Sequence, residues 1–465
     1  MNRSIVFYLV SRLALINGLA LLIPLLAALW WGEAGLVYFA PALAAALLAA
    51  AFCRYRGRHH KRHLGPGEGA WYMVSAWFLL GLLGMIPYVM AGTFASPVDA
   101  FFESVSAFTT TGTSCLADGG AGLPQSLLLW HSLMEWLGGL NFILLLVSVM
   151  PQVNGCFGLT LSVHQSVSFS PMVARMQEAA RQAGLIYLAI TAFSMVLYVL
   201  AGLPLGMAVN QGLMTMSTSG GDSLFDFSQY DSLYWKSWER RDFKSLFCDA
   251  EWRTFLTVVV VTGCLVSFHL WRFGVYDGWD NLRYGFFQVL SFISTSGFSS
   301  AAYSTWPEFD KYVLFALAFV GGCIGSATGG LKVMRFMVLF KMAAQEMRRT
   351  LHPHMVISLK IDGVPVDMKI ISRVLSYFFL FMATFFVSML IISLSGVTPM
   401  QAMGMAVGCL SSVGSTMDLF GVADVSVLPA WTKLYCSFLM ILGRVEIFSF
   451  LVVIQTAFGY LRRRW

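Results

Sequence analysis

Long apolar stretches, separated by short polar segments, recur along the whole chain. A helix that crosses a membrane needs about 20 predominantly apolar residues. On this basis we expect nine spans, at residues 5–31, 34–53, 69–92, 125–150, 183–203, 254–273, 310–345, 372–396 and 429–460. These runs lack the alternating polarity that the strands of an outer-membrane barrel show. The pattern therefore predicts a polytopic helical membrane protein.

Four shorter, semi-apolar segments lie between these spans, at residues 97–108, 205–216, 279–293 and 398–410. They are too short to cross a bilayer and predict re-entrant half-helices. Each is followed at once by small hydroxyl residues and a glycine. The four runs are Thr109-Thr110-Thr111-Gly112-Thr113, Ser217-Thr218-Ser219-Gly220-Gly221, Ser294-Thr295-Ser296-Gly297-Phe298 and Ser411-Ser412-Val413-Gly414-Ser415. The chain is thus predicted to repeat helix, half-helix, loop and helix four times after two extra helices.

This repeat predicts an all-α fold in which four pore-loop repeats surround a pseudo-fourfold pore. Two leading helices occupy residues 1–66, and the repeats occupy residues 67–155, 172–235, 250–350 and 365–465. The glycines of the four runs are 108, 77 and 117 residues apart, so the middle interval is short by about one helix. We therefore expect the second repeat to lack its outgoing helix. Two explanations stay open: a deletion that impairs the protein, or a non-helical crossing lined by protein.

Composition agrees with this class, because 57% of the residues are hydrophobic and only 12% are charged, against about 25% charged in soluble domains. The densest basic cluster follows the second helix and contains Arg54, Arg56, Arg58, Lys61 and Arg62 with His59, His60 and His63. The positive-inside rule places this loop, and with it the amino terminus, in the cytoplasm. Binding of anionic lipid headgroups is a compatible secondary role.

Catalytic and metal-binding patterns are missing from the sequence. The eight cysteines are scattered without a CxxC pair, and the histidines gather in the basic loop. No glycine-rich phosphate motif stands on a strand-to-helix turn. We therefore expect neither an enzyme nor an organic cofactor.

The four loops have the composition of an ion-binding backbone. Irregular backbone at membrane depth is tolerated only inside protein or along a watery path, so four such loops indicate a shared pathway. Carbonyl and hydroxyl oxygens can replace the water shell of a monovalent cation, and glycine adopts the required backbone angles without penalty. We assign this role to Gly112, Gly220, Gly297 and Gly414, with each half-helix directing its negative dipole end at the ion. Close helix packing against small residues is the alternative.

The predicted span at 310–345 is interrupted by a segment rich in glycine. The segment from Gly321 to Gly330 contains five glycines, Ser326 and Thr328, and glycine destabilises a helix interior. We expect an unwound intramembrane loop, with a simple packing kink as the alternative. Lys332 follows the loop, either as a pore charge or as a residue that reaches the cytoplasmic interface. Arg444 and Glu446 lie in the last span, but residues two apart do not share a helix face.

Three motifs resemble the Trk/Ktr/HKT superfamily of potassium transporters. They are Val98–Glu103 with Phe108–Gly112, the GGxxGSxxGGxK stretch from Gly321 to Lys332, and Leu442–Ile447. The two leading helices make the TrkH-type membrane subunits the nearest group, and the resemblance covers nearly the whole chain. It implies potassium uptake across the bacterial inner membrane by a homodimer. Potassium would be the substrate, and a cytosolic nucleotide-binding subunit of the TrkA type would regulate it.

The resemblance also implies roles for individual residues. The potassium ligands would be Thr110, Thr111, Thr218, Ser219, Thr295, Ser296, Ser412 and Val413, beside Gly112, Gly220, Gly297 and Gly414. The gate would consist of Gly321, Gly322, Gly325, Ser326, Thr328, Gly329, Gly330 and Lys332, which block the pore until the regulator moves them, with Arg444 beside them. Gly112 favours potassium, because relatives that pass sodium tend to have serine there.

The fourth run departs from the pattern of that superfamily. The chain reads Ser412-Val413-Gly414-Ser415-Thr416, where the family usually has Asn before Val-Gly and often Pro-Gly after it. Ligation through the backbone is compatible with this change. Two rival interpretations remain: a secondary transporter with broken helices in inverted repeats, and a non-conducting remnant that has lost one helix.

Overall fold

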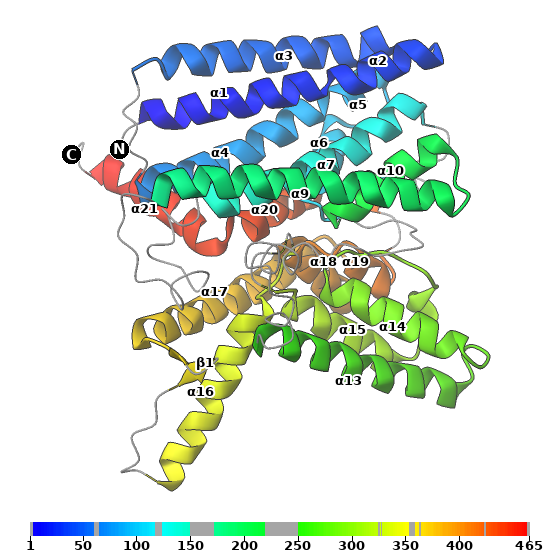
Figure 1. Ribbon diagram of the computed structural model, residues 1–465, viewed down its shortest axis with the longest axis vertical. Helices are drawn as coiled ribbons and strands as arrows, with labels where there is room; N and C mark the ends of the chain where they lie inside the picture. Colours follow the sequence, from blue (N-terminus) through cyan, green and yellow to red (C-terminus); the bar gives the residue numbers. More distant parts are fainter. Residues whose placement is uncertain are drawn as a thin grey trace.

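The computed structural model describes residues 3–59, 65–116, 123–148, 172–218, 250–323, 326, 328–352, 359–361, 364–422 and 425–462. The expected loss of a helix in the second repeat concerns residues 222–253, most of which lie outside the described residues. In the described part the chain forms a bundle in which many of the helices run roughly side by side (Figure 1).

The helices follow the predicted order of long and short segments. They are α1 (Arg3–Ala20), α2 (Leu22–Trp31), α3 (Gly35–Arg56), α4 (Pro66–Gly84), α5 (Ile86–Ala91), α6 (Pro97–Phe108), α7 (Gln125–Ser148), α9 (Met172–Leu200), α10 (Leu205–Ser217), α13 (Ala250–Phe273), α14 (Asp280–Ile293), α15 (Glu308–Val320), α16 (Val333–Leu351), α17 (Met368–Ser393), α18 (Pro399–Ser411), α19 (Ser415–Leu419), α20 (Ala430–Val445) and α21 (Ile447–Arg462). Two short 3-10 turns, at Tyr303–Thr305 and Val425–Val427, are the other helical elements of the described residues.

Seven of the nine predicted spans are long apolar segments within the described residues. They are Arg3–Trp31, Gly35–Arg56, Gly67–Ala91, Gln125–Leu144, Arg181–Leu200, Ala250–Phe273 and Met368–Ser393. The prediction of one continuous helix over 429–460 is wrong, because α20 and α21 meet at an angle of 103°. The segment 310–345 consists of two helices, α15 and α16, on either side of the glycine-rich segment.

The four predicted half-helices are confirmed to within one residue at each end. They are α6, α10, α14 and α18. Two of them begin with a proline, which suits the first turn because its missing N–H has no helical partner there. The Ser96 hydroxyl accepts from the Val98 amide at the start of α6, and Thr398 forms a capping box with Gln401 at the start of α18.

The leading helices form an outer layer along one side of the bundle (Figure 1). Small residues allow α1 and α3 to approach closely, since a Cβ placed on Gly18 would lie 3.3 Å from that of Ala46. Glu33, between α2 and α3, accepts hydrogen bonds from the amides of Gln125 (2.7 Å) and Ser126 (3.1 Å). This carboxylate caps α7 and so ties the leading helices to the first repeat.

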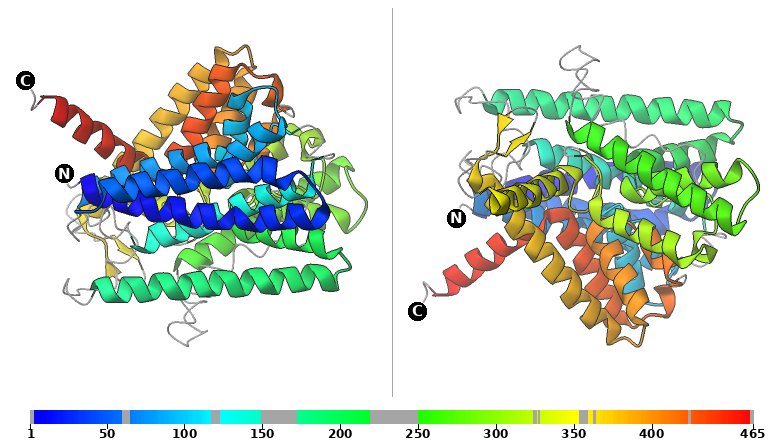
Figure 2. Two further views of the ribbon diagram at one scale, coloured as in Figure 1. Left: turned by 90° about the horizontal axis from the view of Figure 1, so that it is seen from above. Right: turned by 90° about the horizontal axis from the view of Figure 1, so that it is seen from below.

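A two-stranded antiparallel hairpin, β1 (Lys360–Ile361) and β2 (Val364–Pro365), joins α16 to α17, with Lys360 opposite Pro365 and Ile361 opposite Val364. It adds a small element to the predicted all-α fold. Ile361 packs in a separate apolar cluster with Val338 and Ile371. Figure 1 shows α16 extending away from the bundle, and Figure 2 shows α21 pointing outward near the amino terminus.

Candidate functional site

The four hydroxyl–glycine runs begin where the half-helices end, and they share one unusual backbone conformation. The second residue of each run has a positive φ: 50° at Thr110, 59° at Thr218, 55° at Thr295 and 54° at Ser412. All four residues are buried. A left-handed backbone is a genuine outlier for a β-branched residue such as threonine. Its recurrence at four equivalent positions indicates a shared structural requirement.

The glycines of the runs differ in backbone conformation. Gly112 and Gly297 have φ values of 74° and 69°, angles that glycine adopts without penalty. Gly414 has a φ of −57° and a ψ of −36°, which place it at the start of α19. Gly220 and the neighbouring Ser219 lie outside the described residues.

The hydroxyl groups at the left-handed positions form the most distinctive feature of the site. Within the described residues, the side-chain oxygens of Thr110, Thr218 and Ser412 are buried and have no hydrogen-bond partner. At the fourth equivalent position, Thr295 Oγ1 accepts a hydrogen bond from the Gly329 amide at 3.1 Å. Buried polar atoms are normally paired, so repeated exceptions require an explanation. A buried hydroxyl oxygen that accepts no hydrogen bond is available to coordinate a cation.

Flanking hydroxyls in the first and third runs are held by each other. The hydroxyls of Thr109 and Thr111 are 2.9 Å apart, as are those of Ser294 and Ser296. In both runs the hydrogen bond joins the side chains of the first and third residues, and the hydroxyl of the second residue takes no part in it. The fourth run cannot form such a pair, because Val413 stands at its third position.

The fourth run uses its backbone differently from the first and third. The carbonyl of Val413 accepts from the Thr416 amide (3.1 Å) and hydroxyl (2.9 Å), and the carbonyl of Gly414 accepts from the Met417 amide (3.0 Å). The Gly414 amide in turn donates to the carbonyl of Thr111 at 2.7 Å. The carbonyls of Val413, Gly414 and Thr111 thus accept hydrogen bonds within the chain.

The glycine-rich segment after α15 is not helical at its described residues, 321–323, 326 and 328–332, as predicted for an unwound loop. Gly325 lies outside the described residues. The loop lies directly against the runs: Gly329 donates to Thr295, and a Cβ on Gly329 would collide with the Ser411 carbonyl. Gly321 and Gly330 have φ values of 69° and 75°, which glycine adopts without strain.

Lys332 is buried and holds the loop from one end. Its Nζ donates to the Ser326 carbonyl (3.2 Å), the Thr328 hydroxyl (2.8 Å) and the Thr328 carbonyl. Of the two alternatives for Lys332, the buried position beside the loop is the one observed. Gly322, the remaining predicted gate residue, lies close to the same two side chains, since a Cβ there would be 2.8 Å from Thr328 Oγ1.

Arg444 reaches the base of the first run from the end of α20. Its Nε donates to the Thr109 carbonyl at 2.5 Å, and the side chain is buried. The ring of Phe142 lies 5.0 Å from Arg444 Cζ and 6.0 Å from Lys332 Nζ. Two basic side chains thus lie near the same aromatic ring beneath the runs, and the ring offsets part of the cost of burying their charges.

Two helix breaks have the same backbone geometry. Lys332 precedes α16 with φ 72° and ψ 136°, and Glu446 precedes α21 with φ 63° and ψ 138°. An ion pair of 2.8 Å between Arg335 and Glu446 joins the two breaks, and Arg335 also stacks on Tyr377 with its Cζ 4.0 Å from the ring centroid. Glu446 therefore pairs with a neighbouring helix, in agreement with the expectation that it does not pair along its own.

A buried polar cluster behind the first run was not predicted from the sequence. Glu103 accepts from the Ser114 hydroxyl at 2.8 Å and the Cys115 amide at 2.7 Å, so it holds the chain just beyond Gly112. His131 lies 3.5 Å from Glu103 and 3.3 Å from Glu135. The available signal was the presence of ionisable residues inside apolar segments, which are costly and serve a purpose.

Two glycines to which no role was assigned from the sequence, Gly138 in α7 and Gly443 in α20, allow close approach to the half-helices. A Cβ on Gly138 would collide with the Phe108 carbonyl, and one on Gly443 with the Leu410 carbonyl. Gly329 has the same relation to Ser411. Only glycine permits backbone to approach backbone this closely, so these positions set how tightly the runs are held.

Comparison with known proteins places the chain among transporters. A sequence profile of the TrkH family, described as a cation transport protein, matches residues 37–220 and 230–458. The Trk system potassium uptake protein TrkH of Halomonas elongata is 30% identical over 489 residues, which covers 98% of this chain and 99% of that protein. The protein of the same name from Escherichia coli K12 is 30% identical over 478 residues, covering 97% of this chain and 98% of the relative.

A solved structure agrees with the sequence matches. The crystal structure of the potassium transporter TrkH from Vibrio parahaemolyticus aligns with a TM-score of 0.87 at 27% identity, covering 97% of this chain and 98% of the other. The fold is therefore that of a polytopic helical membrane protein with pore-loop repeats, as predicted, and the family is a transport family rather than one of enzymes. The chain belongs to the TrkH family of cation transport proteins.

Proposed function

We propose that this chain carries potassium ions across the cell membrane along a pathway between the four runs. The observation that carries the proposal is the set of buried, unpartnered hydroxyls of Thr110, Thr218 and Ser412, at equivalent left-handed positions. Oxygens so placed replace the water shell of a monovalent cation without a fixed negative charge. The relatives that cover nearly the whole chain are potassium uptake proteins by name, which favours potassium as the ion.

The proposed ligands are oxygens of the four runs. Besides the three unpartnered hydroxyls, they include Thr295 and the carbonyl of Ser296, with Ser219 and Gly220 completing the second run by equivalence. Thr111, Val413 and Gly414 take part only after the hydrogen bonds that their carbonyls accept within the chain are released. The ends of α6, α10, α14 and α18 add a favourable potential for a cation.

The loop from Gly321 to Lys332 is proposed as the gate, with Arg444 and Lys332 as its charges. Gly329 touches the base of two runs, and a loop in that place obstructs the pathway. Opening requires the loop to withdraw, which we assign to a cytosolic nucleotide-binding subunit of the TrkA type acting on a homodimer. The basic residues that follow α3 favour a cytoplasmic amino terminus and insertion in the inner membrane. We also propose that the chain divides into the two leading helices, residues 1–66, and four repeats, residues 67–155, 172–235, 250–350 and 365–465.

A non-conducting remnant is the second candidate, and the Gly414–Thr111 hydrogen bond favours it because it occupies a ligand carbonyl. The test is growth of a bacterium deficient in potassium uptake, at micromolar potassium, with this chain expressed. Potassium transport predicts growth, and the triple variant Thr110→Val, Thr218→Val and Ser412→Ala should abolish it at equal membrane abundance. If cells that express both the unmodified chain and its regulator do not grow, the proposal is overturned.

A further inference from the structure

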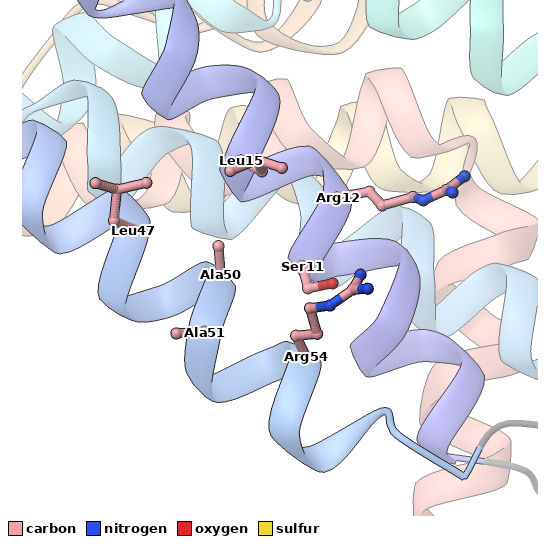
Figure 3. Close-up of a pocket in the computed structure, with 7 residues that line it drawn as sticks. All are labelled: Ser11, Arg12, Leu15, Leu47, Ala50, Ala51 and Arg54. Carbon is pink, nitrogen blue, oxygen red and sulfur yellow. The ribbon is translucent and has the colours of Figure 1, made fainter.

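The two leading helices carry a groove that has no role in the pathway. It lies between α1 and α3, encloses 220 Å³, and is lined by Ser11, Arg12, Leu15, Leu47, Ala50, Ala51 and Arg54. Figure 3 shows the guanidinium groups of Arg12 and Arg54 towards one end of the groove, with Leu15 and Leu47 towards the other. The groove thus has an apolar lining, with two guanidinium groups beside one end of it.

Both arginines lie towards the ends of α1 and α3 that meet near Tyr8 and Gly57, which we assign to the cytoplasmic interface. Arg54 is in the last turn of α3. Arg12 lies further along α1, but its Cζ is 5.1 Å from the ring of Tyr8, one turn back towards the helix end. Long cationic side chains turn in this way towards the membrane interface while their stems cover apolar surface. Leu15 and Leu47 lie further from that interface, where acyl chains are found.

The charges of the groove are not neutralised by the protein. Arg12 and Arg54 are exposed, and neither forms an ion pair with any of the residues that the structure describes. The sequences of α1 and α3 contain no acidic residue. Guanidinium groups bind phosphate through paired, charge-assisted hydrogen bonds, so an anionic phosphate is the partner that this end of the groove fits.

The walls at the other end face lipid rather than protein. Leu15 and Leu47 are each 44% exposed, and the neighbouring Leu48 is 70% exposed. Ala50 and Ser11 are small and buried, which makes the floor of the groove. We propose that this groove binds one anionic glycerophospholipid, with its phosphate at Arg12 and Arg54 and an acyl chain along Leu15 and Leu47. The site depends on insertion in a membrane and not on which ion is transported.

Native mass spectrometry of the purified full chain in detergent, with phosphatidylglycerol or phosphatidylcholine added, tests the site. Each cation near an anionic lipid contributes on the order of a 5-fold gain, so Arg12→Gln with Arg54→Gln should weaken phosphatidylglycerol binding about 25-fold. The matched control is Arg56→Gln with Arg58→Gln, which removes the same charge beside the groove without lining it, and it should retain binding. Size-exclusion chromatography verifies that both variants are folded.

Two further arms separate the parts of the site. Ala51→Phe fills the groove from an exposed position and should weaken phosphatidylglycerol binding although both arginines remain. Glycerol phosphate, which has the headgroup chemistry without acyl chains, should not compete at equal concentration. The proposal would be overturned if Arg12→Gln with Arg54→Gln, or Ala51→Phe, bound phosphatidylglycerol as well as the unmodified chain does. It would also be overturned if both double variants lost phosphatidylglycerol binding equally. Effective competition by glycerol phosphate would overturn it as well.

Discussion

Neutralising Arg444 should raise the basal flow of potassium through the pathway. The change Arg444→Gln retains a donor for the Thr109 carbonyl but removes the charge that now lies 2.5 Å from that oxygen. A cation bound at the first run would be about 6 Å from the guanidinium, and two unit charges at that distance repel by about 3 kcal/mol at an effective dielectric constant of 20. Removing this repulsion corresponds to about 100-fold in rate.

The gain should be smaller than that limit, because Lys332 stays beside the same aromatic ring and the loop still contacts the runs. We expect basal uptake to rise by at least about 10-fold. The assay is rubidium or potassium uptake by cells that lack other uptake systems, at equal membrane abundance. The matched control is Lys433→Gln, which removes a buried charge from the same helix at a site paired with Asp99 (2.6 Å). Uptake that is unchanged or lower in Arg444→Gln would refute the reasoning.

Two further predictions concern the gate loop and the support of the first run. Gly329→Ala places a methyl group against the Ser411 carbonyl, so the loop must withdraw and basal potassium uptake should rise. The control, Gly184→Ala, adds a methyl group at an open helical position and should leave uptake unchanged. Equal uptake in both variants would contradict this account. Glu103→Ala leaves the Ser114 hydroxyl and Cys115 amide without their carboxylate, and since hydrogen bonds to charged groups contribute about 1.5–3 kcal/mol each, the thermal unfolding midpoint in detergent should fall by several degrees. An unchanged midpoint would show that this cluster does not hold the run.

The helical framework was predictable because its signals are local. The half-helices were placed to within one residue by their length, by the prolines at 97 and 399, and by the hydroxyl–glycine runs that end them. The unwound loop was predictable from its glycines. The break at Glu446 was not, because residues 430–458 are long and apolar enough for one span, and the bend accompanies an ion pair with Arg335, which is distant in sequence.

The backbone of the runs shows where sequence reasoning fails at the site itself. Local preference assigns left-handed angles to glycine, yet they occur at Thr110, Thr218, Thr295 and Ser412. Threonine adopts such angles only where the surrounding packing imposes them. Gly414 shows the reverse: its neighbours form the turn of α19, and the glycine takes an ordinary helical conformation. The cluster of Glu103, His131 and Glu135 is likewise assembled by packing between α6 and α7.

The most direct test of potassium transport is ion flux into proteoliposomes that contain the purified Arg444→Gln chain. In this variant the pathway should conduct without the regulatory subunit. The account predicts potassium uptake well above that of empty vesicles and above sodium uptake, and its loss when Thr110→Val, Thr218→Val and Ser412→Ala are added. Potassium uptake equal to that of empty vesicles, or uptake that persists without the three hydroxyls, would contradict it.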